Sequence, residues 1–431
     1  MFLQSIFTSY LPAAINILFS FQRFQESNCK CDVSGRNTLA FVSAHPLTEA
    51  CSVPNEEEEH PLLLPMHNQR GKDKFSSGFN STSDSTNNAF GKYFVYVADL
   101  NTPWDVHLVT STSYEISTLK WDMNNGNSLV FADISGQVEV WQMKEFLLSD
   151  WHCIHKSVYK SEVFLTVFSI GSGRKTYINM DKDPGYYHDK FNFRPAPSIA
   201  QGFGERDMFG LLLVSHTGLV VCLAIPTNGS NVLEAKHAKQ CLNNVTRNRV
   251  RTVDVSFVKD GSLLIAASNG NPLDPIRFYK VAISWIDCAF DDGLELGLNL
   301  ETFPGLCTRR AEGEKSEDRC LALVDLCFVS GDDTDSILVA TTHPAGGRLE
   351  LWELKEFQQN VHKMFLSAGA SMVGDTSSFS LPAWHYVEKF SGPVSQIVSV
   401  ATSQRCFQSG RAAACYVTVA YSDGSIQCLI R

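Results

Sequence analysis

A short order of apolar runs and tight turns recurs along this chain, and it limits the folds that the chain can adopt. Three alternating or apolar runs separated by turns occupy residues 116–143, 250–281, 321–354 and 394–430, and a weaker copy occupies 209–225. Alternation with a period of two is typical of β-strands, and Gly and Asn supply the positive φ that tight hairpin turns require. The chain is therefore predicted to build several small antiparallel sheets, which must stack on one another to bury their faces.

These units predict an all-β fold, a WD40-like β-propeller with about six recognisable blades. One of these six blades is split: residues 37–44 and 92–100 are predicted as two strands on either side of a long polar insertion. A generic all-β sandwich built from hairpins is the alternative. We favour the propeller because one strand-turn-strand order recurs at least four times, and radial repetition leaves only short sheet edges.

Certain residue types return at the same places in the units. A turn containing Asp or Gly precedes a strand that ends in a large side chain, as in Asp133-Ile-Ser-Gly136 before Trp141. The turn carboxylates are expected to accept hydrogen bonds from nearby backbone amides, and the aromatic residues are expected to pack between sheets. The predicted structural repeat positions are Trp121, Asp133, Gly136, Trp141, Gly218, Asp260, Gly261, Tyr279, Gly347, Trp352, Asp423 and Gly424.

Three segments follow from composition. Residues 1–28 form an apolar leader without an assigned role, residues 29–431 form the propeller, and an insertion at about 45–91 interrupts it. The insertion is polar and begins with an acidic run, so we expect it to be disordered. The leader has no basic residue before Arg23 and is broken by Pro12, which fits neither a signal peptide nor a membrane span.

Composition also bears on function. The net charge of −10 argues against direct nucleic-acid binding, which needs a basic face. The 13 cysteines are scattered, and the 12 histidines occur singly, as at His216 in a predicted turn. Metal sites need several convergent ligands, and the phosphate-binding, zinc-protease and serine-hydrolase motifs are absent from the sequence. We therefore expect no catalytic residue, no metal site and no cofactor.

Several ordered segments go beyond a general repeat. They include DLNTPWDVHLV from Asp99, FGLLLVSHTGLVVCL from Phe209, and SNGNPLDPIRFYKV, which ends at Val281. The most specific are the element formed by Pro103, Trp104, Asp105 and His107, and the PIRFYKV element at 275–281. In these segments the chain resembles the Mediator subunit 16 family in its animal form, over most of residues 35–431.

The resemblance implies a WD-like propeller in the tail module of Mediator, the RNA polymerase II coactivator. It also implies a nuclear, non-enzymatic scaffold that contacts other tail subunits and transcription activators, and the polymerase indirectly, without membrane association. The family pattern has a further blade after the point where this chain stops, so about six of an expected seven blades are recognisable and we hypothesise an incomplete ring. A generic WD-repeat adaptor of another intracellular assembly is the alternative. A propeller enzyme would need convergent carboxylates or histidines, which the sequence does not offer.

Overall fold

The computed structural model describes most of the strand-forming chain. The described residues are 30–34, 37–44, 93–122, 126–171, 208–226, 235–242, 249–258, 262–287, 294–308, 320–330, 335–360, 378–391, 395–402 and 416–430. The predicted leader at 1–28 and the predicted insertion at 45–91 lie outside them. Among the residues that are described, no helix is long and apolar enough to cross a membrane.

The described strands form six antiparallel sheets, here called blades 1 to 6. Blade 1 contains β1 (Cys31–Val33), β2 (Thr38–Ser43), β3 (Tyr93–Asp99) and β4 (Val106–Thr112). Blade 2 contains β5 (Ile116–Trp121), β6 (Ser128–Asp133), β7 (Gln137–Met143) and β8 (Trp151–Val158). Blade 3 contains β9 (Phe164–Gly171), β10 (Met208–Ser215), β11 (Leu219–Pro226) and β12 (Lys236–Cys241).

The other three blades follow the same plan. Blade 4 contains β13 (Thr252–Phe257), β14 (Leu263–Ser268), β15 (Ile276–Asp287) and β16 (Leu294–Leu306). Blade 5 contains β17 (Ala322–Ser330), β18 (Asp335–His343), β19 (Gly346–Asn360) and β20 (Ser378–Ser391). Blade 6 contains β21 (Ile397–Thr402), β22 (Tyr416–Tyr421) and β23 (Ile426–Ile430).

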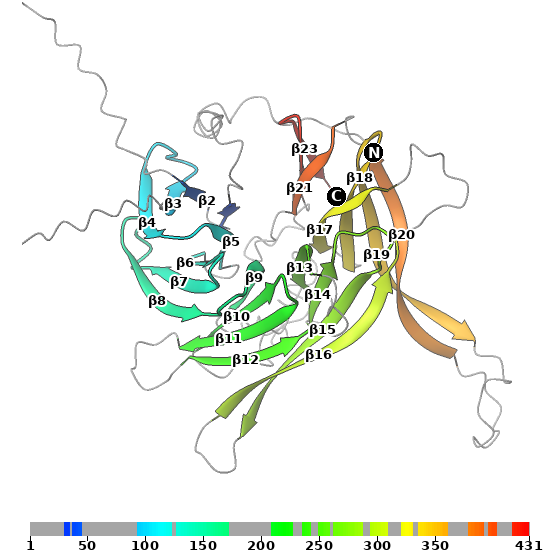
Figure 1. Ribbon diagram of the computed structural model, residues 1–431, viewed down its shortest axis with the longest axis horizontal. Helices are drawn as coiled ribbons and strands as arrows, with labels where there is room; N and C mark the ends of the chain where they lie inside the picture. The colour runs from blue at the N-terminus through cyan, green and yellow to red at the C-terminus, as the bar shows by residue number, and fades with distance from the viewer. Residues whose placement is uncertain are drawn as a thin grey trace, which may run out of the picture.

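Each blade is a meander in which neighbours in sequence are neighbours in the sheet. Figure 1 shows the blades around a common centre, with the first strands β5, β9, β13, β17 and β21 nearest to it. This arrangement confirms the predicted all-β propeller with six recognisable blades. In blades 2 to 5 the structure adds a fourth strand to the predicted units of three runs. The sequence did not predict this strand, because an outer strand is half exposed and carries a weaker apolar signal. For example, burial alternates residue by residue along β12.

The core lies between blades. Five hydrophobic clusters join blades 1 and 2, 2 and 3, 3 and 4, 4 and 5, and 5 and 6. In the described part of the chain, no such cluster joins blade 6 to blade 1. The packing therefore runs as a continuous series through all six blades.

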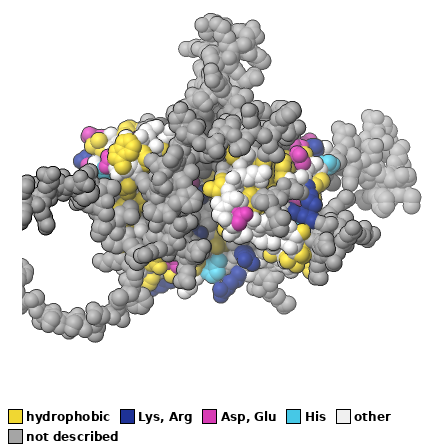
Figure 2. Space-filling view, turned by 90° about the horizontal axis from the view of Figure 1, so that it is seen from above, with side chains coloured by type: hydrophobic (Ala, Val, Ile, Leu, Met, Phe, Trp, Pro, Cys, Tyr) yellow, Lys and Arg dark blue, Asp and Glu magenta, His cyan; other side chains and the backbone are white. Residues whose placement is uncertain are grey.

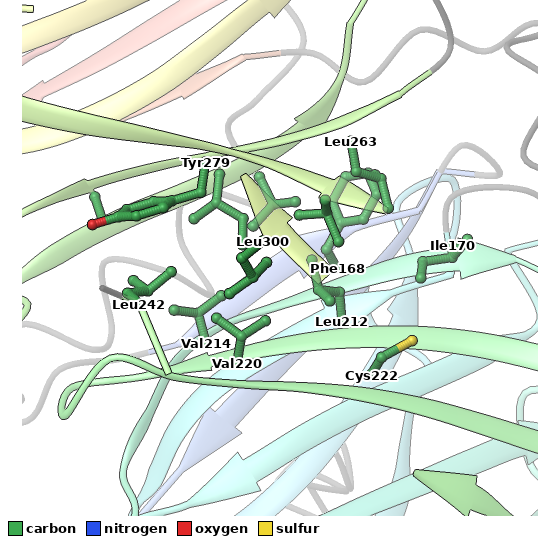
Figure 3. Packing of buried hydrophobic residues seen from close by; sticks show 14 of the residues in the cluster. Phe168, Ile170, Leu212, Val214, Val220, Cys222, Leu242, Leu263, Tyr279 and Leu300 are labelled. Atoms are coloured by element: carbon green, nitrogen blue, oxygen red, sulfur yellow. The ribbon is translucent and has the colours of Figure 1, made fainter. Parts of the chain in front are cut away.

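Strand β10 explains why some units read as continuous apolar runs. Every one of its residues is buried. Because side chains alternate across a strand, Leu212 and Val214 pack toward blade 4, whereas Leu211 and Leu213 pack toward blade 2. Figure 3 shows the first of these faces, where Val214 lies near Leu300 of blade 4. A strand buried on both faces carries no polar alternation.

Candidate functional site

The turn between β6 and β7 is held by one buried carboxylate. Oδ1 of Asp133 accepts hydrogen bonds from the backbone N–H groups of Ser135 (2.9 Å) and Gln137 (3.0 Å), and from the Ser135 hydroxyl (2.6 Å). Asp133 is only 1% exposed, so these three donors replace the water that an ionised carboxylate needs. Gly136 follows with φ of 84°, which the tight turn requires.

Equivalent turns use the same design with different groups. In blade 6, Oδ1 of Asp423 accepts from Ser425 N–H (2.9 Å), and its other oxygen accepts from the Ser395 hydroxyl. These hydrogen bonds, first that from Ser395, lower the pKa of Asp423 to about 2. In blade 3 a hydroxyl replaces the carboxylate, since Ser215 Oγ accepts from Leu219 N–H at 3.1 Å.

The turn glycines share a left-handed backbone. The φ angles of Gly218 and Gly424 are 85° and 82°. Asp260 and Gly261, predicted for the same role in blade 4, lie outside the described residues. Gly347 serves a different purpose at the junction of blades 5 and 6: a Cβ there would lie 2.5 Å from the backbone nitrogen of Ile397. Close approach of the two blades therefore excludes a side chain at this position.

The predicted aromatic positions lie in two environments. Trp121, Tyr279 and Trp352 are buried, with exposed fractions of 2%, 2% and 6%, and each packs in a cluster between blades. Trp141 differs, because it is only partly buried. Its indole N–H donates to Glu139 at 2.8 Å, and Glu139 is also paired with Lys156 at 2.7 Å.

Three aspartates on inner strands connect successive blades, and the sequence patterns did not single them out. Asp32 of β1 accepts from the N–H of Trp121 in blade 2 (2.8 Å), and Asp254 of β13 accepts from Phe328 N–H in blade 5 (2.7 Å). Asp325 of β17 accepts from Val400 N–H in blade 6 at 2.9 Å. Each carboxylate therefore holds the first strand of the following blade.

The three aspartates also share a sheet position. They lie opposite alanines of the second strand, pairing Asp32 with Ala40, Asp254 with Ala266, and Asp325 with Ala340. The available signal was an Asp inside an otherwise apolar first run, as in TVDVSF and LVDLCF. A buried polar residue that recurs in a strand needs a partner.

Charges from several blades meet at the centre. Lys120 Nζ of blade 2 lies 3.6 Å from Asp32, and this carboxylate is the main cause that raises the pKa of Lys120. Asp254 and Cys327, from blades 4 and 5, also act on Lys120. Burial raises the pKa of Asp254 to about 6, against the opposing effects of Phe328 N–H and Lys120. Lys120, Asp32 and Asp254 are half-buried, whereas Cys327 is buried.

The groups at the centre of the propeller have structural roles. The three carboxylates accept backbone hydrogen bonds, and burial raises the pKa of the Cys327 thiol, which keeps this thiol protonated. Within the described ranges, no group of three or more His, Cys, Asp and Glu side chains could hold a metal ion. His216, which the sequence placed in a turn, lies in the β10–β11 connection and accepts from Val163 N–H at 3.2 Å.

Residues 103–105 of the PWD-x-H element lie in the connection between β3 and β4, and His107 lies in β4. Trp104 is 69% exposed, and Pro103 is half-buried beside it. His107 Nε2 lies 3.3 Å from Asp105 Oδ1. Among the described residues, no hydrogen bond joins this element to the turn carboxylates Asp133 and Asp423.

Comparison with known proteins agrees with the geometry. Residues 168–431 match the family described as Mediator complex subunit 16, N-terminal. Proteins named Mediator of RNA polymerase II transcription subunit 16 are similar: that of Aedes aegypti is 29% identical over 351 residues, covering 79% of this chain and 40% of the relative. The human protein is 26% identical over 286 residues, covering 65% of this chain and 31% of the relative.

The chain thus spans less than half the length of the curated relatives that it matches. Among solved structures, the Saccharomyces cerevisiae protein Sqt1 has a TM-score of 0.40 at 10% identity, with 79% of each chain covered. At this level the fold assignment rests on the chain's own sheets. Six radially packed antiparallel sheets with Asp- and Gly-containing turns define a β-propeller of the WD-repeat class. The family match is more specific: the chain belongs to the Mediator complex subunit 16, N-terminal, family.

Proposed function

We propose that this chain is a non-enzymatic scaffold in the tail module of the Mediator complex. There it holds other tail subunits and helps to connect DNA-bound transcription activators with RNA polymerase II, which it contacts indirectly. The observation that carries the proposal is the continuous family match over residues 168–431, which spans most of blade 3 and all of blades 4 to 6. Fold alone would not name a function, since propellers serve many.

The chemistry of the described residues supports a binding role. The aspartates of the inner strands connect blades, and the turn carboxylates accept hydrogen bonds from their own backbone. The net charge of −10 disfavours direct contact with DNA and favours contact with proteins. We place the protein in the nucleus, where Mediator acts.

Affinity purification tests the proposal. The tagged full chain is isolated from nuclear extract, and the proteins that accompany it are identified by mass spectrometry. Recovery of several other Mediator subunits is expected. Recovery of a different assembly, without Mediator subunits, would contradict the proposal and favour a WD-repeat adaptor of another complex.

Two glycine variants provide the control. Gly424→Ala meets nothing within 4 Å, whereas a Cβ at Gly136 would lie 1.9 Å from Tyr159 O. If the blades present the binding surface, Gly424→Ala retains the Mediator subunits and Gly136→Ala loses them. Equal recovery with both variants would show that the recovered proteins bind regardless of the fold.

A further inference from the structure

The loop that contains Trp104 presents a large aromatic side chain to solvent. With 69% of its surface exposed, Trp104 is the second most exposed of the large hydrophobic side chains in the described residues. An indole this exposed contributes little to the core, so its apolar surface is available to a partner. Trp is also the residue type most enriched among those that dominate binding energy.

The backbone holds Trp104 in place. Asp99 Oδ1 accepts from the backbone and side-chain amides of Asn101, at 2.8 and 2.9 Å. Thr102 N–H donates to Asp99 O, and Asp105 N–H donates to Thr102 O at 3.0 Å. Pro103 further fixes the chain directly before the tryptophan. An exposed side chain on a rigid loop loses little entropy on binding, which favours affinity.

A second loop emerges beside the first. The β7–β8 connection, residues 144–150, joins the third and fourth strands of blade 2, as the Trp104 loop does in blade 1. Because both blades have the same strand order and pack together, the two loops emerge at the same face of neighbouring blades. Phe146 and Leu147 are 55% and 52% exposed there. We call residues 99–105 and 144–150 together the Trp104 surface.

The Trp104 surface is acidic. It contains four carboxylates and a single ammonium group, and Lys144 already lies 3.9 Å from Asp150. In Figure 2 hydrophobic side chains gather at the left, with acidic side chains beside them, on the side where Figure 1 shows blades 1 and 2. An exposed indole with carboxylates around it matches a partner that carries Arg or Lys, which can stack on the ring and pair with the acids.

We propose that the Trp104 surface binds an arginine- or lysine-rich segment of another protein in the same assembly. The inference rests on the proposed function for the identity of that assembly. The negative charge disfavours nucleic acid, whose phosphates the carboxylates would repel. A basic peptide segment satisfies both the indole and the acidic rim.

Photocrosslinking in the assembled complex tests the inference. Benzoylphenylalanine is introduced at position 147 of the full chain, which leaves the Trp104 indole in place, and at position 273 as a matched control. Leu273 is also strongly exposed, at 63%, but lies in the β14–β15 connection at the opposite end of the blades. After irradiation of the affinity-purified complex, the crosslinked peptide is sequenced.

The expected result is an adduct from position 147, and none from 273, to a peptide with net positive charge. Asp105→Lys should lower the yield about fivefold, the effect of losing one exposed charge pair. No adduct, or an adduct to an acidic or neutral peptide, overturns the inference even when the complex itself is recovered. Failure to recover Mediator subunits with the unmodified chain instead contradicts the proposed function.

Discussion

Replacing Gly136 with alanine separates two reasons for a glycine in a propeller turn. Its φ of 84° lies in the left-handed region, where an L side chain costs roughly 1–2 kcal/mol. In addition, a Cβ would lie 1.9 Å from Tyr159 O, 2.8 Å from Glu162 O and 2.9 Å from the Tyr159 carbonyl carbon. These are backbone atoms, which cannot rotate away as a flexible side chain would.

The contact places Gly136 against the connection that leads into blade 3. Tyr159 N–H donates to Gly136 O at 2.8 Å, and the Tyr159 ring packs edge-on against Phe164 with centroids 5.4 Å apart. Moving this backbone by more than an ångström breaks the hydrogen bond, worth about 1 kcal/mol, and disturbs the core between blades 2 and 3. Together with the backbone strain, we expect Gly136→Ala to destabilise the fold by roughly 3–5 kcal/mol.

Two other glycines calibrate the result. Gly424 has nearly the same φ, 82°, but a Cβ there meets nothing within 4 Å. Gly424→Ala should therefore destabilise the fold only through backbone strain, by roughly 1–2 kcal/mol. Gly270 also has φ of 82°, and its nearest neighbour is the side-chain Cδ of Arg251 at 2.7 Å, which can move. The expected order of destabilisation is Gly136→Ala, then Gly270→Ala, then Gly424→Ala.

Thermal unfolding followed by circular dichroism, together with urea titration, measures the order on the purified full chain. The reasoning would be refuted by equal midpoints for Gly136→Ala and Gly424→Ala. Such a result would mean that the Tyr159 backbone does not approach Gly136.

Two further predictions concern the core and the centre of the propeller. Trp121→Ala should lower the free energy of unfolding in urea titrations by about 3–5 kcal/mol, because the indole is buried between blades 1 and 2. Trp104→Ala should change it by no more than about 0.5 kcal/mol. Similar losses of stability in both variants would contradict the packing. The pKa of Asp254 is raised from 3.8 to about 6, so the folded state binds the proton of this carboxyl more tightly than the unfolded state does. Proton binding at Asp254 therefore stabilises the fold at low pH, and this contribution is lost as pH rises through about 6. Asp254→Asn keeps an acceptor for Phe328 N–H but removes the titrating carboxyl. Between about pH 7 and pH 4, the unfolding free energy of this variant should therefore gain less than that of the wild type, by at most about 3 kcal/mol. If the variant and the wild type have the same pH profile of stability, the raised pKa of Asp254 is wrong.

The sequence by itself determined the parts of this protein that depend on neighbouring residues. The alternation of apolar residues predicted the strands, and Asp133 with Gly136 predicted a tight turn, because the Asp carboxylate and the Gly backbone act within four residues. The family-specific element at Trp104 was likewise readable, and so was the recurrence of one unit, which favoured a propeller.

Only the tertiary structure decided how the blades are joined. Asp32 and Trp121 are 89 residues apart in the chain, and Asp254 and Phe328 are 74 apart, so no local pattern connects them. The same holds for Lys120, whose charge is balanced by carboxylates of blades 1 and 4. For Trp141, the sequence predicted its place in a strand but not its partial exposure beside Glu139. Hydrogen bonds within a turn follow from chain connectivity, whereas those between blades form only when whole sheets pack against one another and bring their partners together.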